Sequence, residues 1–324
     1  MRMRDQSDPA YFTADAKVRS AWLYFVEGLT QEQIAQALGI TRLKVMRLLA
    51  AARTDGTVRI RIDAKSASQV EYERALAHAF GLETVIVVPS PGEDANAAAL
   101  IGYAAGQWLA GEMRDGLSIA VGWGNTLSLA LRGMEARAYK GASVISLMGG
   151  MTHSRAINPS AVARRVADMF GADCYQLTAP IFVSGPETRD ALLAEPGLCD
   201  LLDRACRSDL ALISTGDLTT SSTLAREGLI SKSDLVSLRS SGAVADVLCH
   251  VIDAHGREVD HPVNRRVMAV GLDVLRRIPR VAIASGGPAK AAAIRAAIRA
   301  SGAKILITDE AAARAILQPG APMA

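Results

Sequence analysis

Short apolar runs alternate with helical patterns through most of this 324-residue chain, and this alternation restricts its fold more than any other feature. The runs occupy residues 84–88, 117–121, 143–148, 209–214, 280–284 and 304–308. Helical patterns lie between them, for example at residues 95–110, 126–134, 160–170 and 289–300. Strands that alternate with helices are typical of a mostly parallel, doubly wound sheet. The pattern therefore predicts a large α/β domain over residues 63–324, and such sheets bind ligands beyond the carboxyl ends of their strands.

The N-terminal part of the chain has a different organisation. Residues 1–15 are polar, charged and without period, which predicts a flexible tail. From residue 16 apolar side chains recur at steps of three and four, so an amphipathic helix is expected that ends near Gly28. At residues 57–62 polar and apolar side chains alternate, as in a strand. We expect a separate, small helical domain over residues 16–62.

The segment after Gly28 predicts two short helices joined by a tight turn. Thr30 and Gln33 have the spacing of a capping box. Gly39 supplies the turn, and Thr41 caps a second helix whose outer face is basic. This arrangement is typical of a helix-turn-helix motif, although a helical hairpin with a solvated basic face is the plainer alternative.

A helix-turn-helix inserts its second helix into the major groove of DNA. The residues expected to contact bases or phosphates are Gln31, Gln33, Thr41, Arg42, Lys44 and Arg47. Gln31 and Gln33 are also candidates for capping contacts. Residues 1–65 hold 11 lysines and arginines against 7 acidic residues, whereas the rest of the chain holds 25 against 26. The positive charge is concentrated where phosphates would be met. Residues 57–62 form either a wing, with Arg59 and Arg61 facing phosphate, or a solvated edge strand.

Two predicted strands end in glycine-rich loops. Gly122-Trp123-Gly124-Asn125-Thr126 follows one strand, and we expect Thr126 to cap the next helix, whose free N–H groups suit a phosphate. An ordinary strand–helix turn is the alternative. In the second loop Gly286 and Gly287 precede Lys290, which lies near the positive N-terminal end of a helix. A cation is unfavourable there unless an anion is bound, so an anion site is predicted.

Two carboxylates are further candidates for the ligand site. Asp217 closes a strand and is expected either to accept hydrogen bonds from ligand hydroxyls or to cap the next helix. Asp246 lies inside the apolar run of a hairpin-like stretch, where a carboxylate is costly without a partner. Its candidate partners are Arg265, Arg266 and a ligand hydroxyl.

The sequence lacks the motifs of several common kinds of catalytic and metal-binding site. The five histidines lack zinc-ligand spacing, and neither GxSxG nor HExxH occurs, so no metal, cofactor or catalytic residue is expected. The four cysteines form no CxxC pair and are expected to be reduced thiols, with Cys174 and Cys249 buried on strands. No apolar window is long enough to span a membrane, and no export signal is seen, so a cytoplasmic location is expected.

Taken together, the motifs resemble the SorC/DeoR-type family of sugar-binding bacterial transcriptional regulators. The matching segments are GLTQEQIAQALGITRLKVMRLL, GWGNTL, STGD, SGAVADVL, ASGGPAKAAAI and AKILITDEAAA, in the family's order from about residue 16 to residue 317. The resemblance implies an effector domain with the fold of sugar-phosphate isomerases and CoA transferases but without a required catalytic residue. It also implies a phosphorylated sugar or related metabolite as effector, and a homotetramer, a dimer of dimers, on palindromic operator DNA.

The resemblance also assigns roles to individual residues. It implies that Gly122, Gly124, Asn125 and Thr126 hold a phosphate, that Asp217 and Asp246 lie in or near the pocket, and that Lys290 holds the anionic ligand. The full expected effector set is Gly122, Trp123, Gly124, Asn125, Thr126, Asp217, Asp246, Arg266, Gly286, Gly287 and Lys290.

The sequence departs from the family pattern at several positions. Trp123 and Asn125 stand where some relatives have a Gly/Thr-rich loop, Asp246 replaces a glutamate, and Met148-Gly149-Gly150 lacks a basic residue. A monophosphate or an unphosphorylated polyol fits these departures better than a bisphosphate. We therefore expect a DNA-binding regulator controlled by a sugar phosphate or polyol. The alternative is a sugar-phosphate isomerase or transferase in which Asp217 or Asp246 is the general base.

Overall fold

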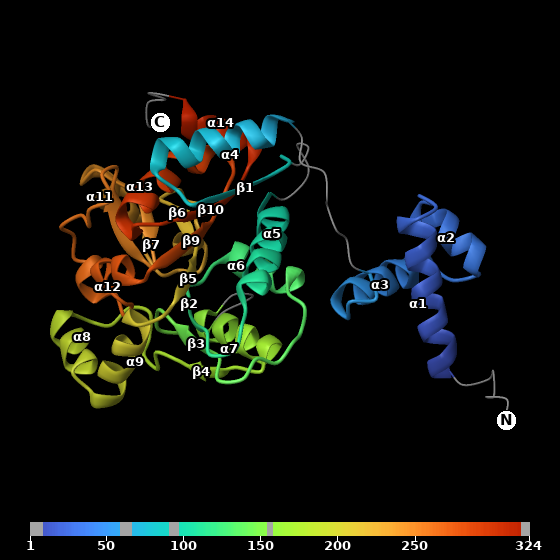
Figure 1. The fold of residues 1–324 in the computed structure, drawn as a ribbon, viewed down its shortest axis with the longest axis horizontal. Helices are drawn as coiled ribbons and strands as arrows, with labels where there is room; N and C mark the ends of the chain where they lie inside the picture. The colour runs from blue at the N-terminus through green and yellow to red at the C-terminus, as the bar shows by residue number, and fades with distance from the viewer. Residues whose placement is uncertain (1–8, 59–66, 91–96, 154–157, 319–324) are drawn as a thin grey trace. The chain divides into compact units, whose positions relative to one another are not determined.

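The structure is a computed structural model that describes residues 9–58, 67–90, 97–153 and 158–318. Its internal contacts divide the chain into two compact units, residues 1–64 and 65–324 (Figure 1). The predicted wing residues 59–62 lie outside the described residues, so the choice between a wing and an edge strand stays open.

The first unit is built from α1 (Pro9–Phe25), α2 (Gln31–Leu38) and α3 (Arg42–Thr54). The prediction of a loose tail up to residue 15 is wrong for residues 9–15, which belong to α1. Proline suits the first turn of a helix, and residues 10–15 contain no glycine and two alanines, so helix formation needs no apolar period there. The core of the unit consists of Ala21, Ile34, Ala35, Val45, Leu49 and Ala52.

The second unit is a doubly wound α/β domain, as predicted. Its strands are β1 (Thr84–Val88), β2 (Ser118–Val121), β3 (Ser143–Ser146), β4 (Asp173–Tyr175), β5 (Leu210–Ile213), β6 (Thr215–Asp217), β7 (Ala243–Val247), β8 (His250–Asp253), β9 (Arg280–Ala284) and β10 (Ile305–Asp309). Its α-helices are α4 (Ala67–Phe80), α5 (Ala97–Glu112), α6 (Asn125–Ala130), α7 (Pro159–Phe170), α8 (Pro186–Leu193), α9 (Pro196–Cys206), α10 (Thr223–Arg226), α11 (Lys232–Ser240), α12 (Leu272–Arg277), α13 (Ala291–Ser301) and α14 (Glu310–Leu317). The 3-10 turns are η1 (Leu131–Gly133), η2 (Asn264–Arg266) and η3 (Pro288–Lys290).

The main sheet has seven parallel strands in the order β1-β10-β9-β5-β2-β3-β4. The chain moves outward from β2 through β3 to β4 and then returns to the other side of β2 with β5. The loops after β2 and β5 therefore leave the sheet in opposite directions, and open α/β sheets bind ligands at such a point. A three-stranded antiparallel sheet, β6-β7-β8, follows β5.

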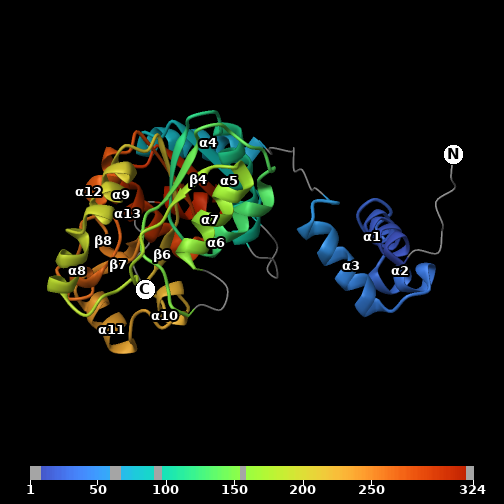
Figure 2. The same ribbon diagram turned by 90° about the horizontal axis from the view of Figure 1, so that it is seen from below.

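Helices cover both faces of the main sheet. Figures 1 and 2 show α5, α6 and α7 on one side and α9, α12 and α13 on the other. The central strand β5 is buried at all four positions, as expected for a parallel strand covered on both faces. Each of the predicted apolar runs contains a strand of this sheet, with ends that differ by at most two residues.

Candidate effector site and DNA-binding unit

Four segments at the ends of strands, three of which hold predicted effector residues, lie next to one another in the main sheet. The loop 122–126 follows β2, the segment 214–217 follows β5, the loop 285–290 follows β9, and residues 308–310 end β10. These strands are adjacent in the order β10-β9-β5-β2. Because parallel strands end at the same edge of a sheet, the loops meet at one edge, beside the point between β2 and β5 where the strand order reverses.

The loop after β2 is shaped by close packing. A Cβ atom on Gly122 would lie 2.9 Å from the Leu248 side chain, so this glycine is required by a protein contact. Gly124 has a φ of +128° and is the N-cap of α6. The prediction that Thr126 caps this helix is wrong, because α6 begins one residue before it, and Thr126 is buried within the first turn.

Trp123, expected to bind the effector, has its side chain in the core. It is buried, and its indole N–H donates a hydrogen bond to the thiol of Cys249. Burial raises the pKa of that thiol well above its usual value. Cys249 lies in the turn between β7 and β8 and Cys174 on β4, and only the first is fully buried. The Trp123 side chain therefore anchors the loop 122–126 in the hydrophobic core.

Asp246 is the buried carboxylate of the site. It lies on β7, is 6% exposed, and accepts a hydrogen bond from the backbone N–H of Cys249 at 3.3 Å. A Cβ atom on Gly216 would lie 2.1 Å from its Oδ1, so only glycine fits opposite it. Burial raises the pKa of Asp246 to about 6, against the effect of the Cys249 N–H and of the Lys290 ammonium.

The expected arginine partners of Asp246 are not found. Arg265 is paired with Asp260 at 2.7 Å. Arg266 lies over the ring of Phe182, and its buried Nε has no hydrogen-bond partner among the described residues. Both arginines fall in η2, and that short turn directs them elsewhere. The positive charge that acts on Asp246 comes instead from Lys290.

A strained turn holds Asp246 in place. Leu248 and Cys249 form the two-residue connection between β7 and β8, and both have positive φ, 52° and 68°. Such turns favour asparagine and glycine, because a Cβ atom is unfavourable in the left-handed region. The Leu248 side chain packs on Gly122, and the Cys249 N–H binds Asp246. Strain of this kind is often found at ligand sites, and sequence reasoning missed it because no turn residue marks the position.

The loop after β9 is positioned by Asp309. Its carboxylate accepts hydrogen bonds from the Gly287 N–H at 2.7 Å and the Ser90 hydroxyl at 3.1 Å. Gly286 leaves no room for a Cβ atom, which would lie 2.3 Å from Asp309 Oδ1. Asp309 also caps α14, because its side chain accepts a hydrogen bond from the N–H of Ala312. Lys290 follows at the end of η3 and directly before α13, and it is half-buried.

Asp217 is tied to the chain that follows it. Its Oδ1 accepts hydrogen bonds from the N–H and the hydroxyl of Thr219, at 3.0 and 2.6 Å. The next helix, α10, is capped by Ser222 instead. Asp217 is half-buried and close enough to raise the pKa of Asp246. The two carboxylates therefore belong to one polar cluster.

The helix-turn-helix forms as the capping pattern predicts. Thr30 and Gln33 make both hydrogen bonds of the capping box, and Gly39 ends α2 in the left-handed conformation. Thr41 caps α3 by accepting a hydrogen bond from the N–H of Lys44. The Gln33 side chain thus serves in the cap, one of the two roles expected for it.

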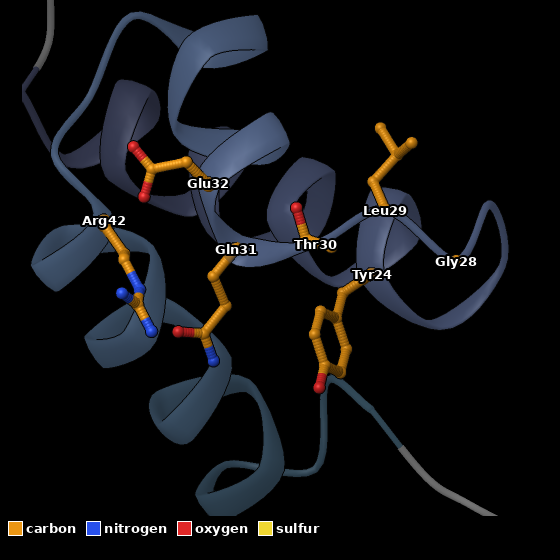
Figure 3. Close-up of a pocket in the computed structure, with 7 residues that line it drawn as sticks. All are labelled: Tyr24, Gly28, Leu29, Thr30, Gln31, Glu32 and Arg42. Carbon is orange, nitrogen blue, oxygen red and sulfur yellow. The ribbon is translucent and has the colours of Figure 1, made fainter.

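The basic residues of α3 are free to meet an external anion. Arg42, Lys44 and Arg47 are exposed and have no ion-pair partner among the described residues. Figure 3 shows an open hollow in which the Gln31 and Arg42 side chains extend to the same side. Its lining residues are Tyr24, Gly28, Leu29, Thr30, Gln31, Glu32 and Arg42. The hollow spans the start of α2 and the start of α3, where contacts to bases or phosphates are expected.

Neither a membrane-spanning helix nor a metal-binding cluster is present in the part of the chain that the structure describes. No helix there is long and apolar enough to cross a bilayer. No group of three or more histidine, cysteine, aspartate or glutamate side chains there is arranged to hold a metal ion.

Comparison with known proteins agrees with this division. The family model of the sugar-binding domain (Sugar-bind) matches residues 65–318. The chain is 32% identical over 302 residues to the erythritol catabolism regulatory protein EryD of Brucella abortus, covering 93% of this chain and 95% of that protein. It is 31% identical to the transcriptional regulator LsrR of Klebsiella pneumoniae, covering 92% and 91% of the two chains.

Solved structures show the same fold. The full-length sorbitol operon regulator SorC of Klebsiella pneumoniae aligns with a TM-score of 0.70 at 21% identity, over 94% of this chain and all of that one. A DeoR family transcriptional regulator of Listeria monocytogenes aligns with a TM-score of 0.70 at 23% identity, over 77% and 99%. With the helix-turn-helix and the matching sugar-binding domain, these relatives show that the chain belongs to the SorC/DeoR-type family of sugar-binding transcriptional regulators.

Proposed function

We propose that this regulator binds double-stranded operator DNA through α2 and α3 and releases or tightens that binding when a sugar or polyol, in monophosphorylated form, occupies the β2/β5/β9 edge. The observation that carries the proposal is the meeting of the 122–126 loop, Asp217, Asp246 and Lys290 at one sheet edge. The ligand would bias the protein between two arrangements and so couple the two sites.

The chemistry of the site favours a ligand with several hydroxyls and one anionic end. Asp217 and Asp246 are hydroxyl acceptors, and Lys290 supplies a cation beside them. The N–H groups at the start of α6 are placed for a phosphate. The Brucella relative is named as a regulator of erythritol catabolism, and this supports a short polyol as the skeleton of the ligand. A site with one lysine suits a monophosphate better than a bisphosphate.

We expect a homotetramer, arranged as a dimer of dimers, to be the DNA-binding form. A helix-turn-helix reads only a few base pairs, so a symmetric dimer that presents two copies of α3 would bind two half-sites of a palindrome. The proposed location of this activity is the cytoplasm, where both operator DNA and sugar phosphates are found.

Replacing both Arg42 and Lys44 with alanine is expected to weaken operator binding at least about tenfold, because phosphate contacts dominate affinity for DNA. The salt dependence of binding should become shallower, since fewer counterions are released. Fluorescence anisotropy with a labelled operator at several salt concentrations measures both effects. Lys232→Ala, an exposed lysine on α11, is the control for a lost positive charge. Equal weakening in the control would contradict the assignment to α3.

The alternative function, a sugar-phosphate isomerase or transferase, rests on Asp246. A buried carboxyl with a pKa near 6 has the property of a general base. The relatives are named as regulators, which favours binding without turnover. We propose that the chain is not an enzyme, and incubation of sugar phosphates with the protein should leave them unchanged by NMR. Turnover that disappears in Asp246→Asn would favour the enzyme instead.

A further inference from the structure

Two large apolar side chains lie exposed at the start of α3. Leu43 is 52% exposed and Met46 is 47% exposed. The buried side of the same helix is formed by Val45, Leu48, Leu49 and Ala52. A helix on the surface of a protein normally carries polar side chains opposite its buried stripe, so exposed leucine and methionine at this place require an explanation.

The two side chains occupy the centre and one flank of the outward face. At about 100° per residue, Leu43 points almost opposite the mean direction of the buried stripe. Arg47, four residues on, lies beside it, and Met46, three residues on, completes the patch. Lys44 lies at one border of the face and Arg42 at the other. An apolar centre is thus bordered by positive charge.

The charge on α3 identifies the class of occupant. Residues 42–54 contain four basic side chains and no acidic one. Arg42, Lys44 and Arg47 have no ion-pair partner among the described residues, so an anionic surface is the complement of this helix. DNA supplies phosphates on both sides of a groove wide enough for a helix, with base edges on its floor. The first turns of the second helix are the part of a helix-turn-helix that approaches those edges.

Leucine offers no hydrogen bond to a base, and methionine only a weak acceptor. The apolar group on the floor of the major groove is the C5 methyl of thymine. We propose that Leu43 and Met46 read thymine methyl groups and so set sequence preference, whereas Arg42 and Lys44 hold phosphates. The proposal rests on the DNA-binding role of α3 and adds a class of base, A·T pairs at fixed positions of each half-site, to it.

The experiment uses duplexes selected by the full-length protein from a randomised DNA pool. Each thymine of the selected half-site is then replaced by deoxyuridine, which removes only the methyl group. At one fixed salt concentration, we expect one or two replacements per half-site to weaken binding about fourfold each, as the loss of one buried methyl would. Replacements at the other thymines should have no effect.

Variants of the two residues make the assignment specific. In each of the variants Leu43→Ala and Met46→Ala, we expect that replacing thymine by deoxyuridine at one of the sensitive positions no longer weakens binding. Both variants should remain folded because both side chains are exposed. Lys44→Ala is the matched control on the same helix: it should weaken all duplexes alike and keep the deoxyuridine effect. Unfolding curves and sedimentation establish that each variant keeps its fold and assembly.

Three results would overturn the proposal. One is a wild-type protein that does not distinguish deoxyuridine from thymine at any position. Another is an undiminished methyl effect in both Leu43→Ala and Met46→Ala. The third is a changed state of assembly in these variants with unchanged base preference, which would assign the patch to a protein contact. If the full-length protein selected no duplex from the randomised pool, the DNA-binding function itself would be contradicted.

Discussion

Asp246→Asn is expected to raise the free energy of unfolding at pH 8 by up to about 3 kcal/mol and to abolish the response to the effector. Burial raises the pKa of this carboxyl from 3.8 to about 6, so its ionised form destabilises the folded protein. A difference of that size corresponds to about 3 kcal/mol. The neutral amide avoids this cost, but it offers one acceptor oxygen where the carboxylate offers two, and its NH2 group cannot accept a hydrogen bond from a ligand hydroxyl.

The pH dependence of this effect has a definite sign. Well below pH 3.8 the carboxyl is protonated in both the folded and the unfolded chain, so its ionisation does not change the free energy of unfolding. As the pH rises toward 6, the unfolded chain releases the proton while the folded chain retains it, so wild-type stability falls. The advantage of Asp246→Asn should therefore grow by about 1 kcal/mol between pH 5 and pH 8, measured by urea denaturation.

The control for this prediction is Asp168→Asn. Asp168 is exposed and forms a surface pair with Arg164 at 3.0 Å. Removal of its charge should change stability by less than about 1 kcal/mol. If Asp246→Asn were less stable than the wild-type protein, or if it kept the effector response, the carboxylate would serve the stability of the fold and not ligand binding.

Gly106→Ala is expected to destabilise the protein by about 2–3 kcal/mol and to weaken effector binding. A Cβ atom on Gly106 would lie 1.9 Å from the carbonyl oxygen of Ala130, at the end of α6. Gly102, one turn earlier on α5, makes a similar approach to the Thr126 carbonyl at 2.7 Å. Displacement of α6 would move the 122–126 loop from which this helix begins.

Gly111→Ala is the matched control on the same helix. A Cβ atom there meets nothing within 4 Å, so alanine should stabilise α5 by up to about 1 kcal/mol. Thermal unfolding and a ligand titration measure both variants. Equal stability of Gly106→Ala and Gly111→Ala would contradict the view that contact between α5 and α6 sets the position of the loop.

Most of the fold could be predicted from local patterns in the sequence. Runs such as 209–214 and 280–284 contain strands that are buried on both faces of a parallel sheet, so their apolar character is continuous and easily seen. The caps at Thr30 and Thr41 act within three residues and leave a direct signature. β6 has only three residues and carries no such signal, so it was not predicted as a separate strand.

The site was predictable only in part. Asp217 and Lys290 were placed at strand ends, and the sheet order makes those ends neighbours. Asp246 was expected inside a hairpin-like stretch, and it lies on β7 close to both of them. The partners of Asp246 were not predictable, since they depend on the turn at Leu248 and on Lys290 from a different strand. Trp123, next to two glycines, was assigned to the ligand by position, although its size and burial place it in the core.

The most direct test of the central claim measures effector binding and operator binding in the same protein. Full-length protein is screened by thermal unfolding against free sugars and polyols and their monophosphates, erythritol included. At 100 times its Kd, a true effector should raise the free energy of unfolding by about 2.7 kcal/mol. The same compound should then change operator affinity in an anisotropy titration.

We predict that a monophosphate produces both effects and that Lys290→Ala loses both while still binding operator DNA. If a free polyol acted equally on the wild-type protein and on Lys290→Ala, the proposal that the effector carries a phosphate would be wrong. A panel without any compound that stabilises the protein and changes operator affinity would contradict the proposed control of DNA binding by a ligand at the β2/β5/β9 edge.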